Sequence, residues 1–191
     1  MVPLFFRLIT SLALTVFFAG YAHAVSAIDR TFSELVQRAE LIVTATVAEA
    51  RATSDGPQAP IFTHVTLTGL EPLKGAVEGD VYVLRISGGV LENRAELIGG
   101  LPRLVPGQRY ILFIRGNGRD VFPVVGIHGG LYRLVWDAAL GQEVVLTARG
   151  ADLSGASLAP NAFPAKARRD EGPLTRERFV DAILRQLETA P

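Results

Sequence analysis

Ser87, His64 and His128 are the candidates for hydrolytic chemistry in this sequence, because a serine can act as the nucleophile and a histidine as the general base. A serine hydrolase places its nucleophile beside a general base, commonly within a GxSxG or SxxK motif, and neither motif follows residue 24. Ser87 ends a predicted strand in the stretch RISGGV, where its hydroxyl could be exposed, but two glycines after a strand are more typical of a turn. A small hydrolase that uses Ser87, His64 or His128 with a carboxylate is therefore kept only as an alternative.

The sequence offers few residues that could bind a metal or a cofactor. The chain has no cysteine, which excludes thiol nucleophiles, thiolate zinc sites and redox pairs. Its three histidines, His23, His64 and His128, show no HxH, HxxxH or HExxH spacing. The GNG stretch at residues 116–118 lacks the third glycine and the following helix of a dinucleotide-binding loop, and it predicts a turn. We predict no catalytic residue, no metal and no cofactor.

The longest connection between predicted strands, residues 88–105, is the best candidate for a binding site. Connections of this length are usually functional or partly disordered, and binding residues favour loops on a rigid scaffold. Glu92 and Glu96 could form the carboxylate pair of a glycosidase, but they bracket Arg94 in a loop and are interpreted as solvated charges. The candidate partner-binding residues are Leu91, Glu92, Arg94, Glu96, Leu97 and Ile98.

Strands must position these residues, because most of the chain alternates apolar and polar side chains. Leu41, Val43 and Val47 share one face of the first strand, as a period of two requires. Short connections rich in glycine and proline favour antiparallel pairing. Pro123 places its strand at an edge or a bulge. The predicted strands are residues 41–50, 61–70, 80–87, 109–115, 120–126, 131–136 and 143–148.

The stretch from Tyr110 to Ile114 is apolar at every position and lies between a Pro-Gly turn and a Gly-Asn-Gly turn. A strand buried on both faces has this composition. A small barrel buries such a strand between its interior and a helix or loop outside. We therefore predict a mainly β fold, a small antiparallel OB-like barrel of about six to seven strands with a short N-terminal helix and a C-terminal amphipathic helix.

The two predicted helices flank the strands. Thr31 and Glu34 have capping-box spacing, which predicts the start of a short amphipathic helix. Near the C-terminus, one helical stripe carries the apolar residues Phe179, Val180, Ile183, Leu184 and Leu187. This helix either docks on the barrel or binds a partner, and docking is favoured because a lone helix of this length is marginal in water. Residues 149–173, rich in Ala, Gly, Pro and Ser, predict a flexible linker.

The first 24 residues have the three parts of a secretory signal peptide. Arg7 precedes an apolar run from Leu8 to Gly20, and small residues flank His23. The run is shorter than the roughly 20 apolar residues that span a membrane, so we predict cleavage after Ala24 and no remaining membrane span. The chain has 19 basic and 19 acidic residues, a balance that predicts no nucleic-acid partner. We expect a periplasmic or extracellular protein.

Several stretches between about residues 30 and 136 carry a family resemblance: AELIVTATVAEA, LEPLKG, RISGG, PGQRYILFIRGNG and VVGIHGGLYRL. In this order they resemble a group of exported bacterial proteins of uncharacterised function. That group is similar to the OB-like barrel of netrin-type and metalloproteinase-inhibitor domains. The resemblance implies a small secreted barrel with a binding role. It implies no functional residue, because those inhibitors coordinate a protease metal through an N-terminal cysteine, and this chain has none.

These features together predict four parts of the chain. They are a signal peptide at residues 1–24, a β-barrel domain at 25–148, a flexible linker at 149–173 and a C-terminal helix at 174–191. The predicted function is that of an exported, non-enzymatic binding module for a protein or cell-envelope partner. The alternatives are the small secreted hydrolase and a structural accessory subunit that docks through its C-terminal helix.

Overall fold

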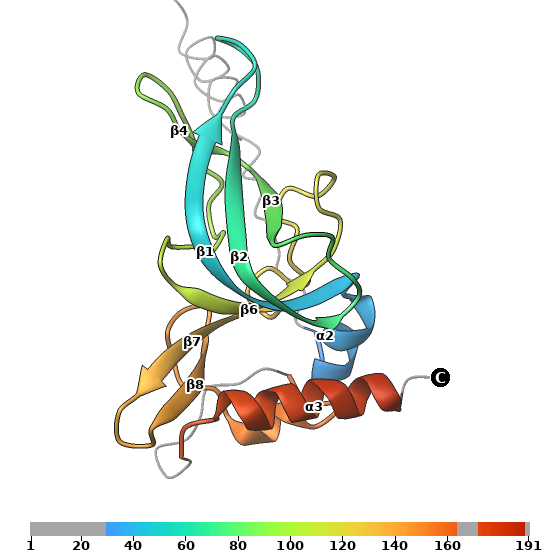
Figure 1. Ribbon diagram of the computed structural model, residues 1–191. Coiled ribbons are helices and arrows are strands. Elements are labelled where there is room, and N and C mark those ends of the chain that lie inside the picture. The colour runs from blue at the N-terminus through green and yellow to red at the C-terminus, as the bar shows by residue number, and fades with distance from the viewer. Residues whose placement is uncertain (1–29, 164–171, 190–191) are drawn as a thin grey trace, which may run out of the picture.

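The computed structural model describes residues 30–163 and 172–189 (Figure 1). The predicted signal peptide, residues 1–24, lies outside the described residues. Helix α2 (Phe32–Arg38) precedes the strands and helix α3 (Arg176–Glu188) follows them. The strands are β1 (Leu41–Thr53), β2 (Phe62–Lys74), β3 (Val81–Ser87), β4 (Gly89–Val90), β5 (Ala95–Glu96), β6 (Arg109–Ile114), β7 (Leu131–Asp137) and β8 (Gln142–Thr147).

Six of these strands form one antiparallel sheet in the order β3-β2-β1-β6-β7-β8, so the predicted mainly β, antiparallel fold is confirmed. β1 joins the β2–β3 side of the sheet to the β6–β8 side, since it pairs with β2 along most of its length and with β6 from Leu41 to Thr46. Three register shifts in the β1–β2 ladder mark bulges, which bend a strand and increase its twist. Figure 1 shows the resulting curvature of β1 and β2.

The sheet does not close into the expected barrel: β3 and β8 are its two edges, and no ladder joins them within the described residues. Both outer edges already have other partners. On β8, Val144 bridges to Thr175 and Leu146 bridges to Asp152. On β3, the Ser87 N–H donates to the carbonyl of Val121 at 2.8 Å. Because these contacts occupy the backbone groups that closure would use, the sheet stays open.

A side-chain amide protects the β3 edge further. Asn117 Oδ1 accepts from the Arg85 N–H at 2.9 Å, and Asn117 Nδ2 donates to the Val83 carbonyl at 2.8 Å. The amide thus makes the donor–acceptor pair that a neighbouring strand would make. The GNG stretch forms a turn, as predicted, and its asparagine covers an edge that would otherwise be free to pair with another chain.

Strand β6 is buried on both faces, as its composition predicts. Ile111 and Phe113 belong to the core on the helix side of the sheet, together with Phe32, Leu35 and Val36 of α2. Tyr110, Leu112 and Ile114 belong to a second core on the other side, where Val43, Ala45 and Val47 of β1 also lie. The Tyr110–Ile114 run is therefore packing surface on both of its faces.

The C-terminal helix α3 docks on the sheet, which is the outcome that the sequence favours over a helix left for a partner. Phe179 and Ile183 are fully buried, whereas Leu184 is 41% exposed. The Phe179 ring lies 4.6 Å from the Tyr132 ring and 5.8 Å from the Phe32 ring, measured between centroids. This aromatic cluster joins α3 to both the sheet and α2.

Residues 149–163, the part of the predicted linker that the structure describes before residue 164, pack against the domain instead of forming a spacer. Leu153 is fully buried in the helix-side core, and a 3-10 helix follows it at Gly155–Leu158. The N–H of Phe32 donates to the Ala162 carbonyl at 2.8 Å. One buried leucine and a few backbone hydrogen bonds fix this segment, although its composition is that of a linker.

The strand predicted at residues 120–126 is also corrected. This segment forms turns and a single bridge between Val124 and Ile114. Pro123 has no N–H to donate, which prevents a continuous ladder at this point. Phe122 and Val124 are nevertheless buried, so the segment covers the sheet without extending it.

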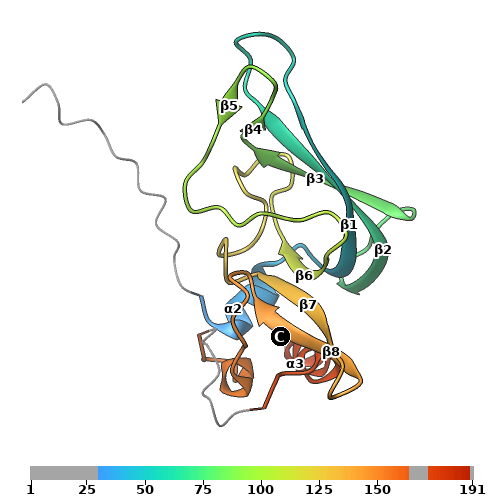
Figure 2. The ribbon, with the colours of Figure 1, turned by 90° about the vertical axis from the view of Figure 1, so that its left-hand side faces the viewer.

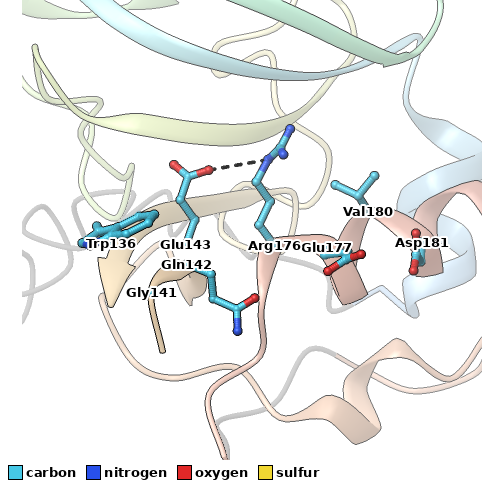
Figure 3. A pocket seen from close by; sticks show the side chains of 8 residues that line it. All are labelled: Trp136, Gly141, Gln142, Glu143, Arg176, Glu177, Val180 and Asp181. Atoms are coloured by element: carbon cyan, nitrogen blue, oxygen red, sulfur yellow. Dashed lines mark ion pairs between the residues drawn. The ribbon is translucent and has the colours of Figure 1, made fainter. Parts of the chain in front are cut away.

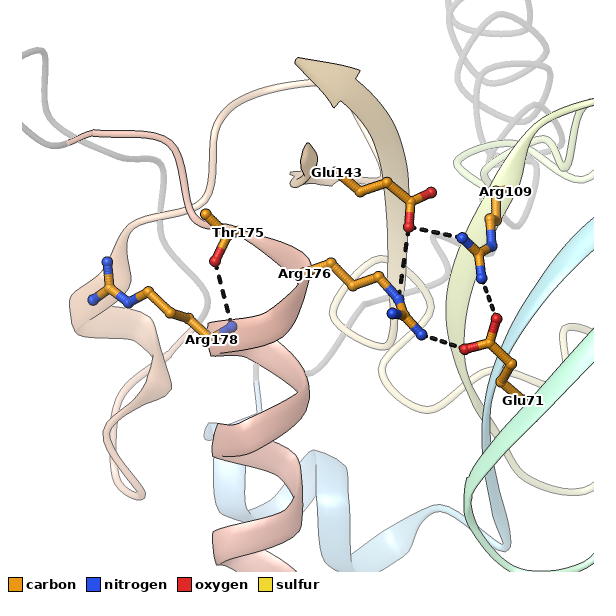
Figure 4. Close-up of polar contacts among 6 residues, drawn as sticks. All are labelled: Glu71, Arg109, Glu143, Thr175, Arg176 and Arg178. Carbon is orange, nitrogen blue, oxygen red and sulfur yellow. Dashed lines mark hydrogen bonds and ion pairs between the residues drawn. The ribbon is translucent and has the colours of Figure 1, made fainter. Parts of the chain in front are cut away.

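Four charged side chains from distant segments form a closed ring of ion pairs (Figure 4). Glu71 of β2 pairs with Arg109 of β6 and with Arg176 of α3. Glu143 of β8 lies 2.7 Å from Arg109 and 3.7 Å from Arg176. Single exposed ion pairs contribute little to stability, but each carboxylate here serves two guanidinium groups in a network. This ion ring fixes the start of α3 against the sheet.

The first prediction concerns the Tyr132 hydroxyl, which is buried and meets no hydrogen-bond partner in residues 30–163 and 172–189. Burial also raises the pKa of this phenol, because the charged form would lose its hydration. Tyr132→Phe should therefore increase the free energy of unfolding, by about 1 kcal/mol. The matched control is Tyr110→Phe, which removes a hydroxyl bonded to Gln108 at 2.8 Å and should destabilise. Urea unfolding measures both, and an equal loss of stability would contradict the prediction.

The second prediction concerns Glu40, whose carboxylate accepts from the Gly116 N–H at 3.0 Å and pairs with Arg119 at 2.9 Å. The Gly116 hydrogen bond, followed by the charge of Arg119, holds the pKa of Glu40 below its usual range. A lowered folded-state pKa stabilises the fold above the unfolded-state pKa, and this stability is lost as the pH falls through the folded-state value. Glu40→Gln should therefore lower the urea midpoint at neutral pH, and the difference from the native protein should shrink as the pH falls and vanish below the folded-state pKa of Glu40. A difference that persists in acid would overturn this assignment, and Glu49→Gln is the control.

Candidate functional site

A groove lies between one face of β1–β3 and the long connection that follows β3; we call it the loop groove. Its cavity volume is about 400 Å³. Its floor is formed by Ala50, Thr63, Val65 and Ile86, and its walls come from residues 87–90 and 96–104. Figure 2 shows the β4–β5 hairpin and the chain after it lying along one side of these strands.

Strand register places the floor residues on one face of the sheet. Ala50 is the cross-strand partner of Val65, and Thr63 is the partner of Ile86. Directly opposed residues point to the same face, and residues two apart along a strand share it. His64 lies between Thr63 and Val65 and therefore points to the opposite face.

The wall of the loop groove is an ordered hairpin. Gly89 pairs with Glu96 and Val90 pairs with Ala95 in the β4–β5 ladder. The carboxylate of Glu96 accepts from the Ile61 N–H at 3.0 Å, which fixes the second strand of the hairpin to the start of β2. Glu96 is thus half-buried and held in place, unlike the solvated loop charge expected from the sequence.

The two glycines of RISGGV allow this hairpin to lie directly on the sheet. A Cβ at Gly88 would stand 2.6 Å from the Glu96 carbonyl oxygen, and a Cβ at Gly89 would stand 2.7 Å from Thr63 Oγ1. Thr63 Oγ1 also donates to the Gly88 carbonyl at 2.7 Å. These glycines mark a close approach of two backbones as well as a change of direction after the strand.

Arg94 ties the tip of the hairpin to the turn between β1 and β2. Its guanidinium donates to the Pro57 carbonyl at 2.6 Å, to Ser54 Oγ at 2.8 Å and to the Ala59 carbonyl. These bonds occupy the guanidinium, so in this structure Arg94 acts as a positioning residue for the loop.

The structure divides the six predicted binding residues into two groups. Glu96, Leu97 and Ile98 line the loop groove. Leu91, Glu92 and Arg94 lie at the hairpin turn, away from it, where Leu91 N–H donates to the Arg94 carbonyl at 2.8 Å. Sequence reasoning missed the floor residues Thr63, Val65 and Ile86, because their alternation predicts core without showing which part of the face stays uncovered.

Large apolar side chains stay exposed at the groove. Leu97 is 69% exposed and Val90 is 62% exposed, and both line the cavity. Ile98, Leu101 and Pro102 are half-buried around it. A concave, mostly apolar surface with a few fixed polar groups is the usual form of a binding site.

The hydrolase candidates do not meet. Ser87 lines the loop groove, but neither histidine does. His64 Nδ1 lies 3.2 Å from Thr53 Oγ1, and His128 lies in a turn that a Gly129-to-Gly126 hydrogen bond closes. Within the described ranges, no hydrogen bond joins Ser87 to either histidine, and no group of three His, Asp or Glu side chains is placed to hold a metal ion.

Comparisons of the chain with protein-family models, with curated proteins and with solved structures give no match. Neither described helix has the length and apolar character that crossing a membrane requires.

The third prediction tests whether Arg94 holds the hairpin. Arg94→Ala should speed amide hydrogen exchange across residues 88–105 by roughly fivefold or more, because loss of its hydrogen bonds costs about 1 kcal/mol of local stability. The control is Arg103→Ala, which removes a groove-lining guanidinium with no polar partner among the described residues. Unchanged exchange in Arg94→Ala, or equal acceleration in both variants, would show that Arg94 does not fix the loop.

Proposed function

We propose that this chain is an exported, non-enzymatic β domain that binds a protein or cell-envelope partner in the loop groove. An apolar segment of the partner lies on the floor of β1–β3 and contacts Leu97 and Val90 at the rim. The signal-peptide pattern of residues 1–24 supports action in the periplasm or outside the cell. The resemblance to exported β-barrel proteins supports the same compartment and a binding role.

The observation that carries this proposal is a preformed apolar groove with exposed large side chains. Each Leu or Val transferred from water to an apolar contact contributes about 1.5–3 kcal/mol. The Arg94 bonds and the Glu96–Ile61 hydrogen bond hold the hairpin in place before any partner arrives. A groove that is already ordered loses little conformational entropy on binding.

The alternatives receive less support. A hydrolase needs a general base beside Ser87, but His64 lies beside Thr53, and His128 lies in the turn that the Gly129-to-Gly126 hydrogen bond closes. An accessory subunit that docks through its C-terminal helix needs a free apolar helix face, but Phe179, Ala182 and Ile183 of α3 are buried in the core of their own domain.

The fourth prediction tests the loop groove with a photocrosslinking amino acid at position 97 in the secreted protein. Crosslinking in intact cell envelopes should trap one specific partner at position 97 and should not trap it at position 121, where the exposed Val121 does not line the groove. Leu97→Asp should weaken binding of the identified partner by about tenfold or more, because an apolar contact is replaced by a desolvated charge.

Val121→Asp is the matched control, since it places the same charge at another exposed apolar residue. It should leave the affinity unchanged. A partner that binds Leu97→Asp as tightly as the native protein, or that crosslinks only from position 121, would disprove the loop groove as the binding site.

A further inference from the structure

A second hollow lies where the β7–β8 hairpin passes the first turns of α3, and we call it the tryptophan hollow (Figure 3). Its cavity volume is about 440 Å³. The hairpin contributes Trp136, Gln142 and Glu143, and α3 contributes Arg176, Glu177 and Asp181. None of these residues belongs to the loop groove, so a ligand of the tryptophan hollow would bind independently of the proposed function.

Trp136 is exposed because its indole lies beyond the N-terminal end of α3. Leu134 and Val145 form a cross-strand pair that is buried under α3. Trp136 and Glu143 form the next pair on the same face, toward the tip of the hairpin and beyond the first turn of the helix. The indole is 65% exposed, which is unusual for the largest apolar side chain in a protein.

Two carboxylates of the hollow have no cationic side chain paired with them among the residues that the structure describes. Glu177 and Asp181 are exposed and one turn apart on α3, a spacing at which like charges destabilise a helix. Neither makes an ion pair or a side-chain hydrogen bond with any residue that the structure describes. Arg176 does not neutralise them, because its guanidinium points toward Glu143 and Glu71 in the ion ring (Figures 3 and 4).

We propose that the tryptophan hollow binds a basic segment of another polypeptide. One Lys or Arg side chain lies over the Trp136 indole, and a neighbouring one pairs with Glu177 and Asp181. The exposed aromatic face and the free carboxylates attract the same class of group, a cation. Arg fits best, since its planar guanidinium both stacks on an aromatic ring and bonds a carboxylate with two N–H groups. A neutral glycan could stack on the indole but would supply no cation to either carboxylate.

The test uses the fact that Trp136 is the single tryptophan of the chain, so its fluorescence reports directly on this hollow. The full mature protein is titrated with a short peptide that alternates arginine and glycine. We expect a saturable change in tryptophan emission that weakens with added salt, because the contacts are charged and close to solvent. The same peptide with citrulline in place of arginine keeps the shape and loses the charge, and it should give no saturable change.

Variants separate this site from general charge attraction. The double substitution Glu177→Gln with Asp181→Asn should weaken peptide binding by roughly fivefold or more, since two charge pairs are lost. Glu78→Gln with Asp80→Asn removes the same charge from an exposed turn between β2 and β3 and should leave binding unchanged. Trp136→Leu should weaken binding measured by calorimetry, with native stability in urea.

Three results would overturn the proposal. The first is equal binding of the arginine and citrulline peptides. The second is equal binding by the native protein and the Glu177→Gln, Asp181→Asn variant. The third is a saturable emission change with a neutral oligosaccharide and none with the arginine peptide, which would assign the hollow to glycans.

Discussion

Strand β6 has no polar face, and the rest of the domain is arranged around that constraint. An apolar face left in water would cost about 25 cal/mol for each Å² exposed, so both sides of the strand must be covered. Helices α2 and α3 cover Ile111 and Phe113 on one side. On the other side the curved first strands and the segment around Phe122 and Val124 cover Leu112 and its neighbours. A chain without cysteine achieves this cover by packing alone.

Covering both faces also explains why the sheet remains open. The segments that protect its two edges, Asn117 at β3 and the bridges of Thr175 and Asp152 at β8, are the ends of the same connections that cover the cores. The ion ring then fixes α3 at one place on the sheet. The helix covers the pair of Leu134 and Val145 and leaves the tip of the hairpin uncovered, and both hollows lie where such cover ends.

Local patterns in the sequence predict the local structure well. The capping box of Thr31 and Glu34 is present, and the alternation of β1 and the apolar run of β6 are buried as expected. What could not be predicted depends on contacts between distant residues. Asn117 bonds a strand 32 residues earlier in the chain, and Leu153 is buried although its neighbours are those of a linker. Periodicity identifies a buried face but does not say which neighbour buries it.

The candidate sites divide in the same way. Loop length directed the prediction of a binding site to residues 88–105, and three of the six residues chosen there line a groove. The floor of that groove, and the exposure of Trp136 beyond α3, depend on how far one element extends past another. A tryptophan in a strand pattern predicts a core residue, and Trp136 is exposed only because the covering helix does not reach it.

The asparagine at the β3 edge also limits how long the domain keeps its protected edge. Asn117 is followed by Gly118, a pair in which the side-chain amide is readily lost by deamidation, and a carboxylate there would repel the Val83 carbonyl that the amide now binds. Deamidation would thus remove the protection of the β3 edge while both cores were still intact, and the exposed edge could then pair with a strand of another chain.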